Sequence, residues 1–179
     1  MRIIAGELGG RVVMAPKTRG TRPMTDKVRA ALFDAVGSVQ DITMLDAYAG
    51  SGAVGFEALS RGAQQVVAVE SARPALTAIQ ANQQSLGIAW GYSLYQMSVE
   101  TWLARHSLAD SQRYELIVAD PPYDRLAADV LEKLGSLLQP SGWLVVSHSS
   151  RRPAPALSGL ELAADKVYGD SALGFYKPA

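Results

Sequence analysis

Short apolar runs alternate with stretches of helical periodicity through the middle of the chain. Runs of mostly apolar residues that end at turn-forming or polar residues predict buried strands at 43–46, 65–70, 92–97, 114–119 and 143–147. Apolar residues at helical spacing predict helices between these runs, over 56–61, 73–87, 99–106 and 126–138. Pro140-Ser141-Gly142 is expected to end the last of these helices. Strands that alternate with helices are typical of an α/β fold built on a parallel sheet.

The first 24 residues lack this alternation and are rich in glycine and basic side chains. Residues 2–6 and 11–14 are predicted to pair as a hairpin, because Gly9-Gly10 between them suits a turn. We therefore expect a small N-terminal extension over 1–24 and one larger domain over 25–179.

Thr25 is a predicted helix N-cap, since apolar residues then recur every fourth position at Val28, Leu32 and Val36. At the other end of the chain, 161–168 and 172–176 read as two strands joined by a turn. Such a hairpin can supply an antiparallel edge to an otherwise parallel sheet. Residues 151–156, which contain Arg151-Arg152-Pro153, are the only linker-like stretch.

Composition limits the kind of protein this can be. A chain of 179 residues with 48% hydrophobic and 19% charged residues is ordinary for one soluble domain. It has no cysteine and two widely separated histidines, so we expect no disulfides and no metal site. No apolar run is long enough to span a bilayer, and the N-terminus lacks the apolar core of a signal peptide. These features predict a cytoplasmic protein, with a monomer as the default.

The net charge is zero, but the charges are unevenly distributed along the chain. The first 40 residues hold seven basic and three acidic side chains, which gives +4 and leaves −4 for the remainder. A basic segment on an acidic body favours contact with a polyanion such as nucleic acid. The alternative is a charged, solvated terminus. The basic residues proposed to make this contact are Arg2, Arg11, Arg19 and Arg22.

A glycine-rich loop follows the first predicted strand. Gly50, Gly52 and Gly55 have the spacing Gly-x-Gly-x-x-Gly between a strand and a helix, which lets a nucleotide-like ligand approach the backbone. The pattern alone also fits a dinucleotide. Asp46 ends the preceding strand, and the spacing Asp-x-x-x-Gly-x-Gly is similar to the cofactor loop of Rossmann-like methyltransferases. Residues proposed to bind S-adenosylmethionine here are Asp46, Ala47, Tyr48, Ala49, Gly50, Ser51 and Gly52.

Three further positions extend this candidate cofactor site. Glu70 ends the second predicted strand, where an acid is placed to accept hydrogen bonds from both ribose hydroxyls. Ser98 and Val99 follow the third predicted strand, where the adenine is expected to lie. The alternative is that the loop is only a tight strand–helix turn, in which the glycines are needed for packing.

The most distinctive stretch is Asp120-Pro121-Pro122-Tyr123, which follows the fourth predicted strand. Two consecutive prolines fix φ and remove backbone donors, so the loop is stiff. It offers a carboxylate, free carbonyl acceptors and a flat ring on which a base can stack. The pattern resembles the (Asp/Asn)-Pro-Pro-(Tyr/Phe) motif of methyltransferases that modify planar amino nitrogens. These four residues are the proposed catalytic residues.

A closer resemblance covers the chain from residue 2 to Tyr123. Matching segments occur in order at Arg2–Gly6, Gly10-Arg11, Arg22–Arg29, Leu32-Phe33, Asp46–Ala53, Glu57–Gly62 and Asp120–Tyr123. The pattern is similar to that of the ribosomal RNA small-subunit methyltransferase D family, and its Arg-Pro-x-Thr-Asp-x-Val-Arg block is the most specific part. Two positions depart from the family: Met24 replaces the usual threonine, and Ser98 replaces an Asp or Asn that can bond adenine.

The resemblance implies a Rossmann-like class I fold, with a mostly parallel seven-stranded sheet, a C-terminal antiparallel hairpin and the small N-terminal β-hairpin extension. It implies methyl transfer from S-adenosylmethionine to the 2-amino group of one guanine in 16S rRNA, within an assembled or assembling small ribosomal subunit. It adds Thr25 and Arg29 as residues near the cofactor or the incoming nucleotide, although helical spacing alone also allows Arg29 to lie at the surface.

Three alternatives remain at this point. The same loop motif occurs in methyltransferases that act on adenine in DNA or on glutamine in proteins. A second alternative is an RNA-binding assembly factor that holds the cofactor without turnover. A third is a Rossmann dehydrogenase, in which the two consecutive prolines would have no role.

Overall fold

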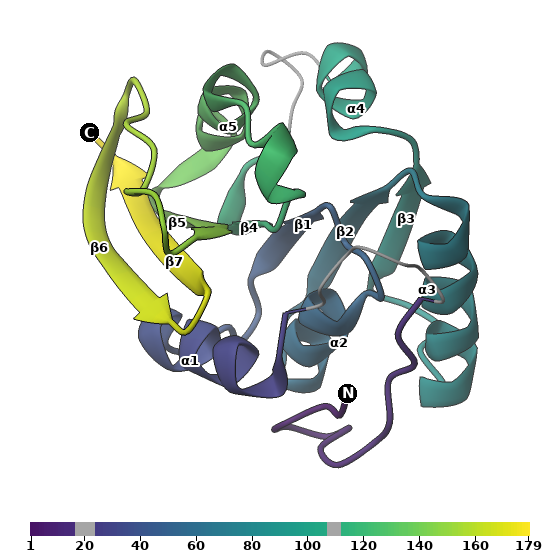
Figure 1. The fold of residues 1–179 in the computed structure, drawn as a ribbon. Coiled ribbons are helices and arrows are strands. Elements are labelled where there is room, and N and C mark those ends of the chain that lie inside the picture. Colours follow the sequence, from purple (N-terminus) through teal and green to yellow (C-terminus); the bar gives the residue numbers. More distant parts are fainter. Residues whose placement is uncertain (17–23, 107–111) are drawn as a thin grey trace.

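The computed structural model describes residues 1–16, 24–106 and 112–179, which form a seven-stranded sheet with helices on both faces (Figure 1). The strands are β1 Thr43–Ala47, β2 Gln65–Glu70, β3 Tyr92–Gln96, β4 Tyr114–Ala119, β5 Leu138–Ser149, β6 Leu160–Tyr168 and β7 Ser171–Pro178. The helices are α1 Asp26–Val36, α2 Ala53–Ser60, α3 Arg73–Leu86, α4 Val99–Arg105 and α5 Ala128–Gly135, with a 3₁₀ turn η1 over Tyr123–Arg125.

The strand order is β3-β2-β1-β4-β5-β7-β6. The first five strands in this order run parallel, and β7 pairs antiparallel with both β5 and β6. This confirms the predicted fold class, including the C-terminal hairpin. Because β2, β1 and β4 are adjacent and parallel, the residues that follow them meet at one edge of the sheet, which we call the carboxyl edge.

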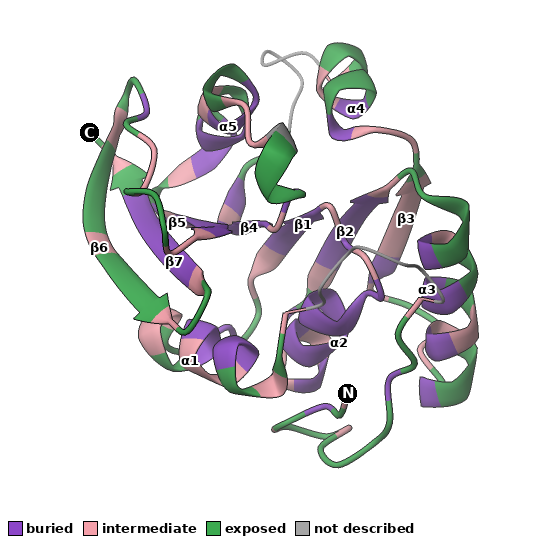
Figure 2. Cartoon of the chain, viewed as in Figure 1, coloured by how far each residue is buried: buried purple, intermediate pink, exposed green. Residues whose placement is uncertain are grey.

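Two hydrophobic layers enclose the sheet (Figure 2). One layer packs α1, α2 and α3 against one face, and the other packs α4 and α5 against the opposite face. Successive residues of each strand point to opposite faces, so Met44 and Val66 enter the first layer while Leu45 and Val67 enter the second. The longest of the described helices, α3, has 14 residues. None of the described helices is long and apolar enough to cross a membrane.

One predicted element is wrong in its boundaries. The helix expected over 126–138 ends at Gly135, and Leu138 is instead the first residue of β5, paired with Tyr114. Pro140-Ser141-Gly142 lies inside β5 at a register shift rather than ending a helix. A Cβ on Gly142 would lie 2.9 Å from the Tyr114 carbonyl oxygen, so the strand passes too close to its neighbour for a side chain there.

The N-terminal segment forms a short hairpin that packs onto the main body. Arg2 and Val12 form an antiparallel bridge, and the Ile3 N–H donates to the Arg11 carbonyl at 2.9 Å. The predicted pairing is therefore present, although it extends over a single bridge. Ile3 and Val13 are buried in the same layer as α1 and α2, which makes this segment part of the main hydrophobic core.

A buried carboxylate, Glu57 of α2, fastens this segment to the helices. Its oxygens accept hydrogen bonds from the Ile4 and Ala5 N–H groups, at 2.7 and 3.1 Å. They also pair with the Nε atoms of Arg61 at 2.7 Å and Arg29 at 3.5 Å. The Glu57 and Arg29 side chains are fully buried, so each ion depends on the other and on the backbone donors for compensation.

Replacing Glu57 with alanine should lower the free energy of unfolding by about 3–5 kcal/mol, because it leaves Arg29 as a buried charge without its buried ion-pair partner. Urea denaturation monitored by circular dichroism measures this change. Asp129→Ala is a matched control, because it removes a carboxylate whose side chain is 72% exposed and should have little effect. Equal stabilities for the two variants would show that Glu57 does not hold the N-terminal segment in place.

Candidate active site

The glycine-rich loop after β1 has a backbone that few side chains tolerate. Tyr48, Gly50 and Gly52 all have positive φ, at 65°, 58° and 77°. A Cβ on Gly52 would lie 2.6 Å from the Phe56 ring, so alanine there would have to displace this buried ring. At Gly50 an added Cβ would meet nothing nearer than 4.0 Å, so the loop is open on that side. The loop is thus tightly packed at Gly52 and accessible at Gly50, as the binding of a nucleotide-like ligand requires.

Three carboxylates follow or end adjacent strands at the carboxyl edge: Asp46 in β1, Glu70 in β2 and Asp120 directly after β4. The Asp46 carboxylate accepts from the Gly55 N–H at 3.0 Å, and that of Glu70 accepts from the Gly50 N–H at 2.8 Å. The Asp120 N–H donates to the Ala47 carbonyl at 3.4 Å, which joins the Asp120–Tyr123 loop to the end of β1. The sheet therefore brings together the two loops that the sequence separates by about 70 residues.

Burial changes the protonation of two of these acids, Asp46 and Asp120. Burial raises the pKa of Asp46 from 3.8 to about 7; the Gly55 hydrogen bond opposes this rise, and the charges of Asp120 and Glu70 add to it. Burial also raises the pKa of Asp120 to about 6, against the effect of a hydrogen bond from Ser147. Among the described residues, no cluster of acids and histidines has the arrangement of a metal site. A cationic organic ligand is the natural counter-charge for such an edge.

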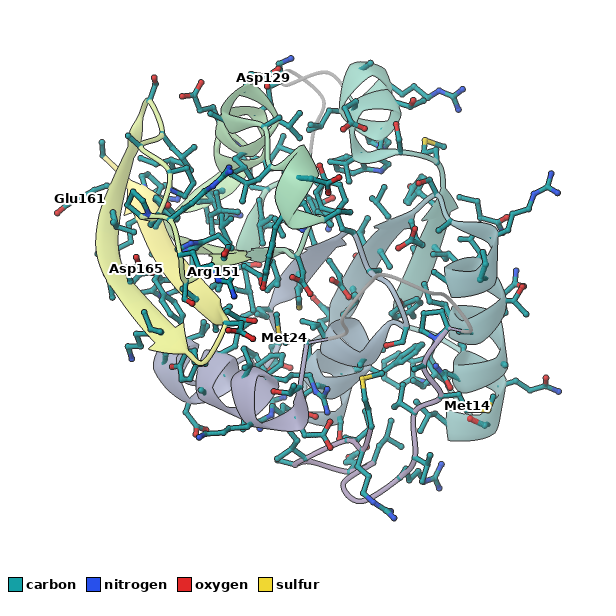
Figure 3. All side chains as sticks on the ribbon, viewed as in Figure 1. Met14, Met24, Asp129, Arg151, Glu161 and Asp165 are labelled. Atoms are coloured by element: carbon teal, nitrogen blue, oxygen red, sulfur yellow. The ribbon has the colours of Figure 1, made fainter. Side chains whose placement is uncertain are left out.

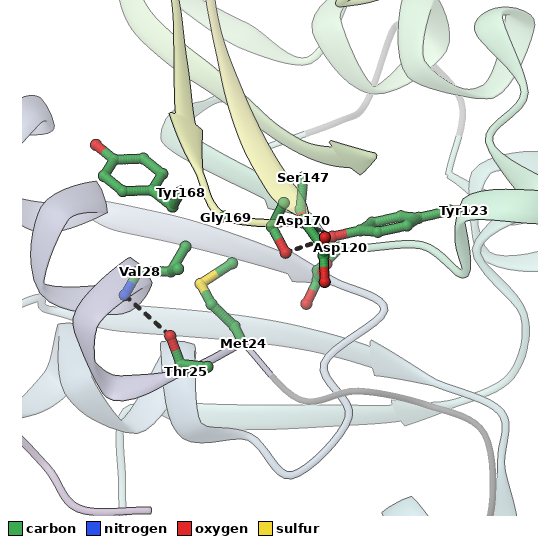
Figure 4. Close-up of a pocket in the computed structure, with 10 residues that line it drawn as sticks. Met24, Thr25, Val28, Asp120, Tyr123, Ser147, Tyr168, Gly169 and Asp170 are labelled. Carbon is green, nitrogen blue, oxygen red and sulfur yellow. Dashed lines mark hydrogen bonds between the residues drawn. The ribbon is translucent and has the colours of Figure 1, made fainter. Parts of the chain in front are cut away.

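The Asp120–Tyr123 loop borders a pocket of about 200 Å³ (Figure 4). Asp120 and Tyr123 form one wall, and α1 together with the residue before its N-cap forms another. The Tyr123 hydroxyl lies 3.0 Å from Ser171 Oγ and 3.4 Å from Ser147 Oγ, which fixes the ring at the rim, 39% exposed. Pro121 is buried and Pro122 is exposed, so the stiff loop has one side packed and the other facing solvent.

Several pocket residues were not predicted from the sequence. They come from the end of β5 and the β6–β7 turn: Ser147, Tyr168, Gly169, Asp170 and Ser171. Ser147 is 3% exposed and bonds both Asp120 and Tyr123. Serines near strand ends are too common to stand out in a sequence, and only the pairing of β7 beside β5 places this turn at the carboxyl edge.

Thr25 and Arg29 have different environments although both belong to the same helical turn. Thr25 lines the pocket, and its hydroxyl caps α1 by accepting from the Val28 N–H at 3.3 Å. Arg29 is fully buried on the other side of α1, where it bonds Asp26, Glu57 and the Arg2 carbonyl. It does not line the described pocket, and the reading that places Arg29 at the surface is wrong, because it is an internal ion-pair partner. Its place near the cofactor or the incoming nucleotide stays a prediction.

The structure places Ser98 and Val99 at the start of α4, just beyond the carboxyl end of β3. The Ser98 hydroxyl is the N-cap of this helix, 3.2 Å from the Thr101 nitrogen, and Val99 is 2% exposed. The serine side chain is thus already engaged with the helix. Adenine recognition at this position would depend on backbone groups more than on the Ser98 hydroxyl.

The basic residues of the N-terminal segment lie away from the pocket where they are described. Arg11 donates to the Leu86 carbonyl at 2.9 Å, at the C-terminus of α3 and hence at the opposite edge of the sheet. Arg2 donates to the Gly10 carbonyl at 3.0 Å, within the hairpin. Arg19 and Arg22 lie outside the described residues.

A Rossmann-like sheet with a glycine-rich loop, strand-end carboxylates and an Asp-Pro-Pro-Tyr loop at one edge defines an S-adenosylmethionine-dependent methyltransferase. The family model described as conserved hypothetical protein 95 matches residues 1–177. The Escherichia coli protein named ribosomal RNA small subunit methyltransferase D is 34% identical over 80% of this chain and 69% of its own length. The chain belongs to this family.

Two further relatives match nearly end to end. Bacillus subtilis YlbH, provisionally named as an rRNA methyltransferase, is 31% identical over 99% of this chain and 98% of its own. The solved structure of E. coli yhhF, provisionally named as a methyltransferase, superposes with a TM-score of 0.86 at 28% identity, covering 99% of this chain and 97% of its own.

The residues at the carboxyl edge fit the cofactor of this class. S-adenosylmethionine has two cationic centres, two ribose hydroxyls and a flat adenine. Three carboxylates near the open Gly50 loop supply acceptors for the cations and the hydroxyls. The Glu70 oxygens already accept backbone hydrogen bonds from Gly50, Ser71 and Ala72, which hold the carboxylate in a fixed orientation.

Asp46→Asn should stabilise the ligand-free protein at pH 8 and weaken binding of S-adenosylhomocysteine. The folded state holds the Asp46 proton more tightly than the unfolded state, so this group's contribution to stability is present below pH 3.8 and is lost as pH rises to about 7. Denaturation at pH 5 and pH 8 should show a smaller loss of stability with rising pH in the variant than in the wild type. Identical pH dependence of stability in both proteins would mean that folding does not raise the pKa of Asp46.

Proposed function

We propose that this protein transfers a methyl group from S-adenosylmethionine to the exocyclic 2-amino group of a guanine in the 16S rRNA of the small ribosomal subunit. The observation that carries the proposal is the joining of the Asp120–Tyr123 loop to the end of β1, beside the glycine-rich loop. The family membership supports it, because its members include proteins named ribosomal RNA small subunit methyltransferase D.

The proposed cofactor site comprises Asp46, the loop Ala47–Gly52, Glu70, Ser98 and Val99. When bound there, S-adenosylmethionine supplies an electrophilic methyl group. Asp46 and Glu70 supply negative charge at the ends of β1 and β2, and Gly50 keeps the loop free of a side chain where the ligand approaches. Val99 begins α4, where its backbone can contact the adenine.

The proposed guanine site is the pocket between the catalytic loop and α1. An exocyclic amine is a weak nucleophile because its lone pair is delocalised into the ring. The Asp120 carboxylate, with a pKa of about 6, is largely ionised at neutral pH and can accept from the amine N–H, which stabilises the positive charge that develops during attack. The proline at 121 leaves the Asp120 carbonyl free as a second acceptor, and Tyr123 offers a ring for stacking.

The target base must leave its stack to reach this pocket, since the acceptors lie below the exposed rim formed by Tyr123. We also propose that the substrate is an assembled or assembling small subunit, that the enzyme acts as a cytoplasmic monomer, and that residues 1–24 extend a catalytic domain over 25–179. The packing of the N-terminal hairpin on Glu57 supports a positioned extension rather than a separate unit.

The test of the reaction uses S-adenosylmethionine with a labelled methyl group. The protein is incubated with small subunits from cells lacking this enzyme, and in parallel with stripped rRNA, DNA and protein acceptors. Labelled 2-methylguanosine in the subunit digest is the expected result. Label in adenine of DNA or in glutamine would overturn the proposal, and cofactor binding without label in any acceptor would favour a non-catalytic binding factor.

Asp120→Ala should slow methyl transfer by about 10²–10³-fold, because it removes a preorganised acceptor from the reacting amine. Single-turnover assays on the same subunits measure this loss, and calorimetry with S-adenosylhomocysteine should show an affinity close to that of the wild type. Asp120→Asn keeps an acceptor oxygen and should lose less. A full single-turnover rate in the alanine variant would remove Asp120 from the mechanism.

Ser147→Ala should shift the acid limb of the pH–rate profile to higher pH. Ser147 lowers the pKa of Asp120 by bonding its carboxylate, so removing the hydroxyl lets burial raise that pKa further, and Asp120 then ionises only at higher pH. Ser171→Ala is the matched control, since its hydroxyl contacts Tyr123 at 3.0 Å and is not a cause of the Asp120 shift. The same profile shift in both variants would contradict a specific role for Ser147.

A further inference from the structure

The catalytic pocket has an electrostatic mismatch with its proposed substrate. Asp120 and Asp170 both line it, and none of the described lining residues is basic. RNA brings one phosphate with every nucleotide, so a strand that inserts a base here places negative charges near the Asp120 carboxylate. Holding that strand requires basic side chains just outside the pocket.

The described arginines of the predicted RNA-binding segment do not meet this need. Arg11 binds a helix C-terminus at the opposite edge of the sheet, and Arg2 is bonded within the hairpin. Arg29 is buried in its ion pairs with Asp26 and Glu57. Among the described residues, other exposed arginines lie at the carboxyl edge, after β5.

Arg151 and Arg152 follow β5 directly, at the carboxyl edge of the sheet (Figure 3 labels Arg151 and Met24). The preceding residue, Ser150, connects them to the pocket rim. Its N–H donates to the Asp170 carbonyl at 3.1 Å, and its hydroxyl donates to the Gly169 carbonyl at 2.8 Å. Gly169 and Asp170 are themselves pocket residues, so Arg151 is one residue away from a group bonded to the pocket lining.

The backbone of this arginine pair is held in place, while the two side chains are exposed. The Arg152 N–H donates to the Ser149 carbonyl at 3.1 Å, and the Arg151 N–H donates to Ser149 Oγ at 3.3 Å. Neither guanidinium has an ion-pair partner among the described parts of the chain. Pro153 follows immediately and limits the backbone further. Two exposed cations on an ordered turn are suited to bind phosphate.

We propose that Arg151 and Arg152 bind phosphates of the RNA nucleotides that flank the target guanine. The inference rests on the proposed function and identifies where the enzyme holds the strand. Consecutive residues are about 3.8 Å apart, and phosphates along a stacked strand are separated by a few ångströms, so a pair of arginines next to the rim can span the nucleotides on one side of a flipped base. The contacts position the RNA without reading its sequence.

The experiment compares the double variant R151A/R152A with a matched control, K133A/K177A. The control also removes two exposed positive charges, from α5 and from the end of β7 farthest from the pocket. Binding of each protein to small subunits lacking the modification is measured by fluorescence anisotropy across a series of salt concentrations. Thermal unfolding and S-adenosylhomocysteine binding are measured on the same preparations.

R151A/R152A should weaken subunit binding about 10-fold or more and reduce the slope of log K against log salt by about 0.7 for each lost phosphate contact. Affinity for S-adenosylhomocysteine and the melting temperature should match the wild type. The conservative variant R151K/R152K should keep most of the salt slope, because lysine retains the charge. The control variant should bind subunits nearly as well as the wild type.

Equal affinity and salt slope for R151A/R152A and K133A/K177A would overturn this inference, even while wild-type methylation of the subunit upholds the proposed function. Wild-type protein that neither binds nor methylates subunits would overturn both. A lower melting temperature together with weaker S-adenosylhomocysteine binding in R151A/R152A would show a structural role for the turn and would also contradict phosphate binding.

Discussion

The site depends on the parallel register of β2, β1 and β4, which brings three carboxylates to one edge of the sheet. Asp46 and Asp120 are costly to bury as ions, and the raised pKa values of both measure that cost. Backbone N–H groups of the glycine-rich loop and a hydroxyl on β5 offset part of it. The positive charge of S-adenosylmethionine bound at the proposed site would offset a further part of this cost.

The second constraint is the buried ion network around Glu57. It fixes α1 relative to α2 and the N-terminal hairpin, while the opposite side of α1 forms a wall of the catalytic pocket. Arg29 and Val28 are sequence neighbours with separate tasks: Arg29 anchors the helix, and Val28 lines the pocket. This division explains how a segment without a large core of its own can help to shape the pocket.

The pocket itself is a composite of elements from both halves of the chain. Its acceptors come from the loop after β4, its hydroxyl groups from β5 and β7, and its apolar wall from α1. An acidic, hydroxyl-rich pocket can polarise an amine, but it repels the phosphates of the strand that carries the base. The proposed binding of phosphates by Arg151 and Arg152 would resolve this conflict, because it separates basic groups at the rim from acid inside the pocket.

Much of this architecture is local and was therefore predictable from the sequence. β2 has the predicted bounds Gln65–Glu70, Thr25 caps α1, and the hairpin turns at Gly169-Asp170, because side-chain periodicity, capping and turn chemistry act between near neighbours. The glycine-rich loop, Glu70 and the Asp-Pro-Pro-Tyr loop were identifiable because strand ends carry unusual residues at fixed spacing.

Tertiary structure decided the features that depend on partners distant in sequence. Leu138 pairs with Tyr114 instead of extending a helix, Arg29 is buried against Glu57, and Ser147 lies beside Asp120. The periodicity of apolar and polar residues indicates only whether a residue has an apolar or a polar environment. Which strand or ion contacts that residue is set by the packing of the whole chain.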